Sequence, residues 1–189
     1  MRIVKLIRKR FSDRPIFTIY EIKKYTKNPY QLLNYLLKRE EIARITKGYY
    51  TFKKDIMVVG NAYFPYYYGL YEALSLRNLF EQETNPIVIT PRKVRTGLRK
   101  FLGRNYIVKR IRRKMFFGFE TMQYYDFNIY VSDLEKTFID FIYFKEPLEK
   151  NILRTLIRKL NKKKLYNYLK RCNPRLKRKV SSQYEKLKF

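Results

Sequence analysis

The sequence predicts an α+β fold, and three observations predict it. Apolar residues recur at helical spacing near both ends of the chain, and short β-branched runs bounded by turn residues occupy its middle. Hydrophobic residues make up 46% and aromatic residues 17% of the 189 residues, which is enough for a packed core. We expect two units, residues 1–55 and residues 62–189, with a helical and basic C-terminal part.

The N-terminal unit begins with two predicted helices. Met1–Phe11 is basic and amphipathic, and we expect a helix whose apolar side carries Ile3, Val4, Leu6 and Ile7. Thr18 is a good N-cap, and Glu21 three residues later completes a capping box for a second helix, Ile19–Tyr25. The turn Lys27-Asn28-Pro29 ends that helix.

A third helix, Tyr30–Glu40, is predicted to have two different faces. Leu33, Leu36 and Leu37 share a face with Glu40 and give the apolar spacing of a core stripe. The opposite face carries a continuous polar stripe of Gln31, Asn34, Tyr35 and Lys38.

A β-hairpin with a basic tip follows this helix. Its strands are Ile42–Ile45 and Tyr49–Phe52, joined through Thr46-Lys47-Gly48. The order of helix, turn, polar-striped helix and basic hairpin is that of a winged helix-turn-helix, so we predict that the polar stripe, Lys47 and Tyr49 contact DNA. The alternative is a plain packing module, because any surface helix needs a polar face.

Charge and composition bound the function. The formal net charge is +28, which favours a polyanionic partner, nucleic acid first and an anionic membrane surface second. No apolar run approaches the length of a membrane span. The single cysteine, Cys172, excludes an internal disulfide and fits a cytoplasmic protein, and the absence of histidine argues against zinc sites and histidine bases.

The middle of the chain predicts a boundary, an aromatic segment and a helix. We place the boundary in Lys53–Asn61, as a short strand or connector, and expect a helix over Gly69–Phe80. The tyrosines at 66, 67, 68 and 71 are candidates for stacking on unpaired bases, but an aromatic seam between helix and sheet is favoured.

The segment Arg92–Lys114 is the most basic internal region, and no acid occurs between Glu83 and Glu120. We predict that it contacts phosphates, with charged edge protection as the alternative. Before it we expect a buried strand, Ile87–Thr90, and the runs Tyr106–Lys109, Met115–Phe119 and Asp126–Val131 predict several antiparallel strands. Its predicted DNA-binding residues are Arg92, Lys93, Arg95, Arg99, Arg112 and Arg113.

A further helix is expected from Ser132 to about Phe144. Ser132 and Glu135 have the spacing of a second capping box, and Lys136 is placed to pair with Asp140 at i+4. Asp133, Glu135 and Asp140 also suggest a magnesium-dependent nucleic-acid enzyme, although capping and pairing explain these residues without metal.

The remainder, after Pro147, predicts helices to the end of the chain. One apolar stripe includes Leu153, Leu156 and Ile157, and Asn173-Pro174 separates a last helix, Arg175–Phe189. From Lys150 to Tyr184 there is no acid, so this tail is a candidate for a second phosphate-contacting surface.

Three segments together resemble AbiEi-type antitoxins of abortive-infection systems. They are the wing end Lys47-Gly48-Tyr49-Tyr50, the run Tyr67–Leu74 with Glu81-Gln82 after it, and the run Ser132–Asp140. The resemblance implies a DNA-binding regulator that represses its own toxin–antitoxin operon and counteracts a nucleotidyltransferase-type toxin. It transfers no catalytic residue.

We therefore predict a cytoplasmic transcriptional regulator that is not an enzyme, needs no cofactor or metal, and binds the double-stranded operator DNA of its own operon. Three alternatives stay open. They are an RNA-binding protein, a metal-dependent nucleic-acid enzyme, and a protein whose basic surface neutralises an acidic toxin. No heptad seam or interface stripe indicates an oligomeric state.

Overall fold

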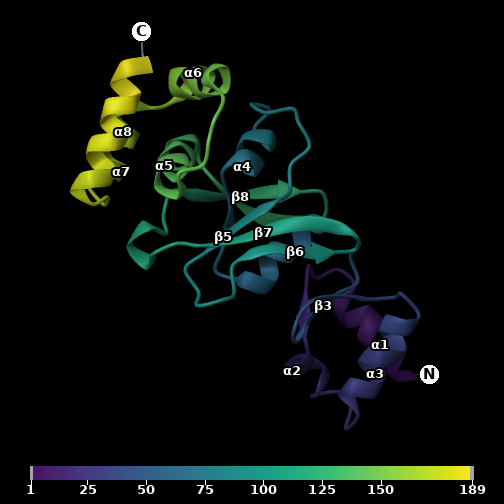
Figure 1. Ribbon diagram of the computed structural model, residues 1–189. Coiled ribbons are helices and arrows are strands. Elements are labelled where there is room, and N and C mark those ends of the chain that lie inside the picture. The colour runs from purple at the N-terminus through teal and green to yellow at the C-terminus, as the bar shows by residue number, and fades with distance from the viewer. Residues whose placement is uncertain (1, 188–189) are drawn as a thin grey trace.

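A computed structural model describes residues 2–187 and shows a mixed α+β fold (Figure 1). A small helical unit with a three-stranded sheet lies at the N-terminal end, and a six-stranded sheet with α-helices on one face and the 3-10 helix η1 on the other forms the rest. The helices are α1 (Arg2–Phe11), α2 (Ile19–Ile22), α3 (Pro29–Lys38), α4 (Tyr71–Ser75), α5 (Leu134–Phe144), α6 (Lys150–Lys159), α7 (Lys162–Leu169) and α8 (Pro174–Leu187), with 3-10 helices η1 (Ile56–Tyr63) and η2 (Arg113–Met115). The strands are β1 (Phe17–Thr18), β2 (Ala43–Thr46), β3 (Tyr49–Thr51), β4 (Tyr67–Tyr68), β5 (Ile87–Thr90), β6 (Gly97–Phe101), β7 (Arg104–Arg110), β8 (Phe119–Tyr124) and β9 (Phe127–Ser132).

The N-terminal unit packs its three helices and three antiparallel strands, in the order β1-β3-β2, around a core of its own. The expected hairpin of β2 and β3 is confirmed, and β1 is an addition. The prediction that Leu6 faces the core is wrong, because Leu6 is 45% exposed and Phe11 takes the third buried position of α1. The buried face of α3 also differs from the expected one. Leu32 is buried together with Leu33 and Leu36, whereas Leu37 is only half-buried.

The larger sheet has the order β6-β7-β5-β4-β9-β8 and is mixed. Antiparallel pairs are present as expected, β6 with β7 and β8 with β9, but the sheet also has two parallel pairs that were not expected, β5 with β7 and β4 with β9. The helix expected over Gly69–Phe80 is wrong in length. Only the short helix α4 forms, because Tyr68 belongs to β4 and the chain turns at Asn78, which has a positive φ of 55°.

Met115–Phe119 is not a strand either. It begins in η2 and continues as a loop in which Gly118 has a φ of +69°. A Cβ at Gly118 would lie 2.8 Å from the ring of Tyr168 and 2.9 Å from Cβ of Lys136, so only glycine fits between α5 and α7 at this point. Strand β8 therefore starts only at Phe119.

The alternation of side chains along the strands divides the core of this region into two layers. Ile87 and Ile89 of β5 face the cluster beneath α4 to α8, whereas Val88 between them faces the opposite cluster. That opposite cluster contains all of η1 except Gly60 and Asn61, and it also receives Ala43 and Ile45 from the hairpin. The expected connector Lys53–Asn61 thus ends in a buried 3-10 helix.

Four helices complete the chain and cover one face of the sheet (Figure 1). Leu153, Leu156 and Ile157 of α6 are buried as expected, and the predicted last helix is present as α8, its final two residues lying outside the described range. Nowhere between residues 2 and 187 does a helix combine the length and the apolar character needed to span a bilayer.

Candidate nucleic-acid interface

The start of α2 is defined by hydrogen bonds between Thr18 and Glu21. The hydroxyl of Thr18 accepts a hydrogen bond from the N–H of Glu21 at 3.3 Å, and the Glu21 carboxylate accepts one from the N–H of Thr18 at 2.8 Å. Burial would raise the pKa of Glu21, but these hydrogen bonds and the neighbouring Arg14 outweigh it and lower the pKa. The predicted capping box is confirmed, so α2 starts at a defined residue next to α3.

The outer face of α3 is polar and open. Gln31, Asn34, Tyr35 and Lys38 are all exposed, while the opposite face of the helix is packed into the N-terminal core. Tyr35 is 38% exposed and its ring lies 5.4 Å from the guanidinium carbon of Arg39. The stripe therefore has the donors, the acceptors and the free surface that contact with base edges requires.

The hairpin places its two predicted contact residues differently. Lys47 is exposed in the turn between β2 and β3, where Gly48 has a φ of +83° and its carbonyl accepts a hydrogen bond from Ile19 N at 3.0 Å. Tyr49 is half-buried and packs toward the core of the larger sheet. Lys47 is thus open to a phosphate, whereas Tyr49 mainly joins the hairpin to the rest of the molecule.

Two of the arginines predicted to bind DNA also hold loops in place. Arg92 donates from Nη1 to the carbonyls of Ala62 and Phe64 at 3.3 and 3.4 Å, and Arg99 donates from Nη2 to the carbonyl of Arg95 at 2.5 Å. Both side chains are half-buried, and Arg95 itself is exposed.

Four of the predicted residues come together at one end of the larger sheet. Strands β5 and β7 are parallel and in register, with Thr90 opposite Arg110, so the segments that follow them leave the sheet at the same edge. They enclose a hollow of about 540 Å³, which we call the basic hollow. It is lined by Pro91, Arg92, Lys93, Arg110, Ile111, Arg112 and Arg113.

Sequence reasoning grouped Arg110 with the basic region but did not select it as a contact residue. Arg110 lines the basic hollow because it ends β7, which runs parallel to β5, and this parallel pairing was not predicted from the sequence. Among residues 2–187, none of the five cations of the basic hollow pairs with a carboxylate.

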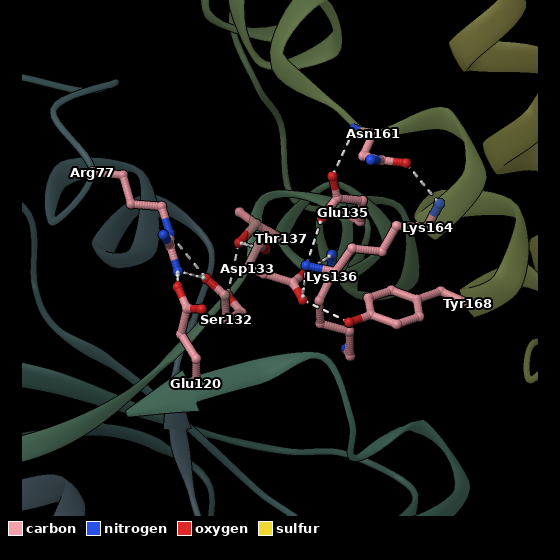
Figure 2. A network of polar contacts seen from close by, with 10 residues as sticks. All are labelled: Arg77, Glu120, Ser132, Asp133, Glu135, Lys136, Thr137, Asn161, Lys164 and Tyr168. Carbon is pink, nitrogen blue, oxygen red and sulfur yellow. Dashed lines mark hydrogen bonds and ion pairs between the residues drawn. The ribbon is translucent and has the colours of Figure 1, made fainter. Parts of the chain in front are cut away.

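The acids of the Ser132–Asp140 run form an internal polar network (Figure 2). The expected capping by Ser132 is wrong. Asp133 is the N-cap of α5, its carboxylate accepting from Lys136 N at 2.8 Å, while the hydroxyl of Ser132 contacts the hydroxyl of Thr137. Ser132 lies at the end of β9 and pairs with Phe119 of β8, so the helix begins one residue later than a cap at Ser132 requires.

The same network ties α5 to α7. The Asp133 carboxylate also accepts from Tyr168 OH at 2.7 Å and pairs with Lys164 at 3.0 Å (Figure 2). Glu135 accepts from Asn161 N at 2.7 Å and pairs with the same Lys164 at 3.2 Å. Burial and the bond to Asp133 raise the pKa of Tyr168 to about 12, so its hydroxyl stays a donor at neutral pH.

The predicted pairing of Lys136 with Asp140 is confirmed, and both side chains are fully buried. Tyr67 OH donates to Asp140 at 2.8 Å and accepts from Lys136 Nζ at 2.9 Å. Burial lowers the pKa of Lys136 and raises that of Asp140, because both charged forms lose water, while their mutual attraction opposes each shift.

The structure shows how the residues named for two of the alternatives are engaged. Asp133, Glu135 and Asp140 are all engaged by cations or N–H groups, and within residues 2–187 no three or more His, Cys, Asp or Glu side chains are grouped to hold a metal ion. Of the tyrosines considered for base stacking, 66, 67 and 68 are at most 1% exposed and form the favoured aromatic seam, whereas Tyr71 is half-buried and its hydroxyl donates to the carbonyl of Pro147.

Comparison with known protein families finds no family whose model matches the chain, and a search of the curated proteins finds no match.

Proposed function

We propose that this protein is a DNA-binding transcriptional regulator whose residues 2–55 act as a winged helix-turn-helix. The observation that carries the proposal is the exposed polar face of α3, whose opposite face is anchored in the N-terminal core. In this role α3 enters the major groove, with Gln31, Asn34 and Tyr35 at base edges and Lys38 at a nearby phosphate. Lys47, exposed in the hairpin turn, contacts the flanking backbone.

The charge of the chain supports a polyanionic partner. Lysines and arginines number 44 and aspartates and glutamates 16. Exposed cations to which residues 2–187 supply no carboxylate partner, such as Lys93 and Arg95, add affinity that does not depend on sequence and weakens with salt.

The resemblance to AbiEi-type antitoxins supports a more specific role. On that basis the DNA is the operator of the protein's own toxin–antitoxin operon, and residues 62–189 counteract a nucleotidyltransferase-type toxin in the cytoplasm. This role requires no catalytic residue, cofactor or metal in the chain.

The test is binding to the DNA upstream of the protein's own gene against scrambled DNA of equal length, titrated in salt. We expect a preference of at least about 1,000-fold and an affinity that falls steeply as salt rises. Equal affinity for both sequences at every salt concentration would overturn the proposal.

Single substitutions test which residues read the DNA sequence and which add affinity for any sequence. Asn34→Ala is expected to reduce discrimination at one base pair by about 10-fold, because a good side-chain pairing with a base contributes about 1–3 kcal/mol. Arg95→Ala is expected to weaken all sequences alike. Asn167→Ala, a matched change on an exposed position of α7, is the control and should alter neither property. A uniform loss of affinity in Asn34→Ala would place the reading surface elsewhere.

A further inference from the structure

The basic hollow is built on fixed parts of the sheet. The hydroxyl of Thr90, the last residue of β5, donates toward the carbonyls of Tyr63 and Pro65 at 3.1 and 2.8 Å and accepts from Arg92 N at 3.2 Å. The Nη1 atom of Arg92 is held by two further carbonyls, of Ala62 and Phe64. The guanidinium is therefore oriented before any ligand arrives, which lowers the entropic cost of binding an anion.

The positive charge of the basic hollow is not compensated by carboxylates of residues 2–187. Five cationic side chains face one hollow of about 540 Å³ without a described carboxylate partner. Two other cations of β7 do have one, since Lys109 pairs with Glu146 at 2.5 Å and Arg104 with Glu83 at 3.6 Å. Like charges gathered in one concavity repel each other, and a multivalent anion removes that repulsion.

A second, mostly apolar hollow adjoins the first. It measures about 300 Å³, is lined by Pro65, Pro91, Arg92, Arg113 and Phe116, and shares Pro91, Arg92 and Arg113 with the basic hollow. The ring of Phe116 is held by neighbouring rings, its centroid 5.5 Å from that of Tyr67 and 4.7 Å from that of Phe119. A fixed, half-buried aromatic ring next to a group of arginines suits a base attached to phosphates.

The size and place of the two hollows favour a small ligand over a duplex. Pockets of about 300–1,000 Å³ are typical of small-molecule sites. In Figure 1 strand β7 runs from its turn with β6, on the side of α1 and α3, toward the other end of the sheet. The residues that line the basic hollow follow the ends of β5 and β7. DNA lying on α3 would therefore have to extend along the sheet to reach the basic hollow.

We propose that the two hollows form a binding site for a free nucleoside triphosphate. The phosphates occupy the basic hollow among Arg92, Arg112 and Arg113, and the base lies against Phe116 in the apolar hollow. Because stacking and phosphate contacts do not read base identity, the site accepts several bases. This site is additional to the DNA surface of α3 and does not depend on it.

Calorimetric titration of the full chain at about 0.15 M salt, where distant surface charges are screened, tests the proposal. The probes are ATP, GTP, adenosine and inorganic tripolyphosphate. We expect saturable 1:1 binding of ATP and GTP with a Kd below about 100 μM, which corresponds to about −5.5 kcal/mol. Tripolyphosphate should bind about 10-fold more weakly because it lacks a base, and adenosine more weakly still.

Matched variants locate the site. Arg112→Ala with Arg113→Ala should weaken ATP at least about 10-fold, since charge-assisted bonds to phosphate are lost. Arg154→Ala with Arg158→Ala removes two exposed positive charges from α6 and should leave ATP binding within about two-fold, because distant charges are screened. Phe116→Leu should reduce the affinity for ATP toward that for tripolyphosphate without changing the latter. Circular dichroism checks that each variant is folded.

Three outcomes would overturn the proposal. One is the absence of saturable ATP binding. Another is an equal loss of ATP binding in both arginine pairs, which would mean diffuse attraction to the net charge. A third is duplex DNA affinity that depends on Arg112 and Arg113 while ATP does not bind, which would make the basic hollow a DNA backbone contact. The DNA preference tested with Asn34→Ala is measured without nucleotide, so failure of either proposal is seen separately.

Discussion

At the scale of single residues, two contacts between partners within four positions of each other were predictable from the sequence. The capping box of Thr18 with Glu21 and the pairing of Lys136 with Asp140 both follow from helical spacing. The cap of α5 was predicted one residue too early, because Ser132 is claimed by β9, and a strand partner more than ten positions away leaves no local signal. The contact of the buried Tyr67 with the Lys136–Asp140 pair was not predicted for the same reason, because Tyr67 lies far away in sequence.

The buried pair makes a prediction about stability. Lys136→Met leaves Asp140 buried without its cation and should cost about 3–5 kcal/mol of unfolding free energy, because an unpaired buried charge is strongly destabilising. Adding Asp140→Leu to Lys136→Met should recover most of that loss. Urea unfolding of the single and double variants measures both. A double variant as unstable as the single one would mean that the pair contributes specific bonding beyond compensation of charge.

Glu72 makes a prediction about pH. Its side chain is 8% exposed, its carboxylate accepts from the Thr84 hydroxyl at 3.2 Å, and burial raises its pKa from 4.5 to about 6. The folded state therefore holds a proton that the unfolded state has released between these two values. The stabilising contribution is fully present below pH 4.5 and is lost as pH rises through 6, by about 2 kcal/mol at about 1.4 kcal/mol per pKa unit.

The measurement compares the wild type with Glu72→Gln, which cannot titrate at this position. The difference in unfolding free energy between the two, followed from pH 4.5 to 7, should shift by about 2 kcal/mol in favour of the variant. Other carboxylates titrate in both proteins and cancel. A difference that stays constant with pH would show that Glu72 is ionised normally in the folded state.

At the scale of elements, the sequence predicted those whose apolar pattern is long and bounded by clear turns. The hairpin of β2 and β3, the buried strand β5 and the helices α3, α5, α6 and α8 belong to this group. The two-residue strands β1 and β4 and the edge strand β6 were missed, because only tertiary pairing defines them. The parallel pairing of β5 with β7 was also unforeseen, and without it the residues of the basic hollow have no common location.

The N-terminus of α5 makes a prediction for an element. Asp133→Ala removes the cap of the helix and the acceptor of Tyr168, so it should destabilise the protein by about 3 kcal/mol, of which the cap contributes about 1. Ser132→Ala should cost less, about 1 kcal/mol, because only the hydroxyl contact with Thr137 is lost. Thermal and urea unfolding compare the two variants. A larger loss of stability in Ser132→Ala than in Asp133→Ala would mean that Ser132 is the N-cap of α5.

At the scale of the whole molecule, the charge is the dominant property and is read directly from composition. What composition does not reveal is how the charge is distributed. The structure places it on the outer face of α3, around the basic hollow and along helices α6 to α8, where Glu185 is the first acid after Glu149. A net charge of +28 over one folded chain predicts self-repulsion that salt relieves.

We therefore expect salt to stabilise this protein in the absence of nucleic acid. Raising NaCl from about 0.01 M to about 0.15 M shortens the Debye length from about 30 to about 8 Å, which screens distant like charges more than the close ion pairs. The Tm should rise by at least about 3 °C, corresponding to roughly 1 kcal/mol for a chain of this size. The variant Lys163→Gln, Lys170→Gln and Lys177→Gln removes three exposed cations from α7, its C-cap and α8, so its Tm should be higher than that of the wild type at low salt and should rise less on adding NaCl. A Tm that falls with salt in both proteins would mean that the surface ion pairs contribute more to stability than the net repulsion removes.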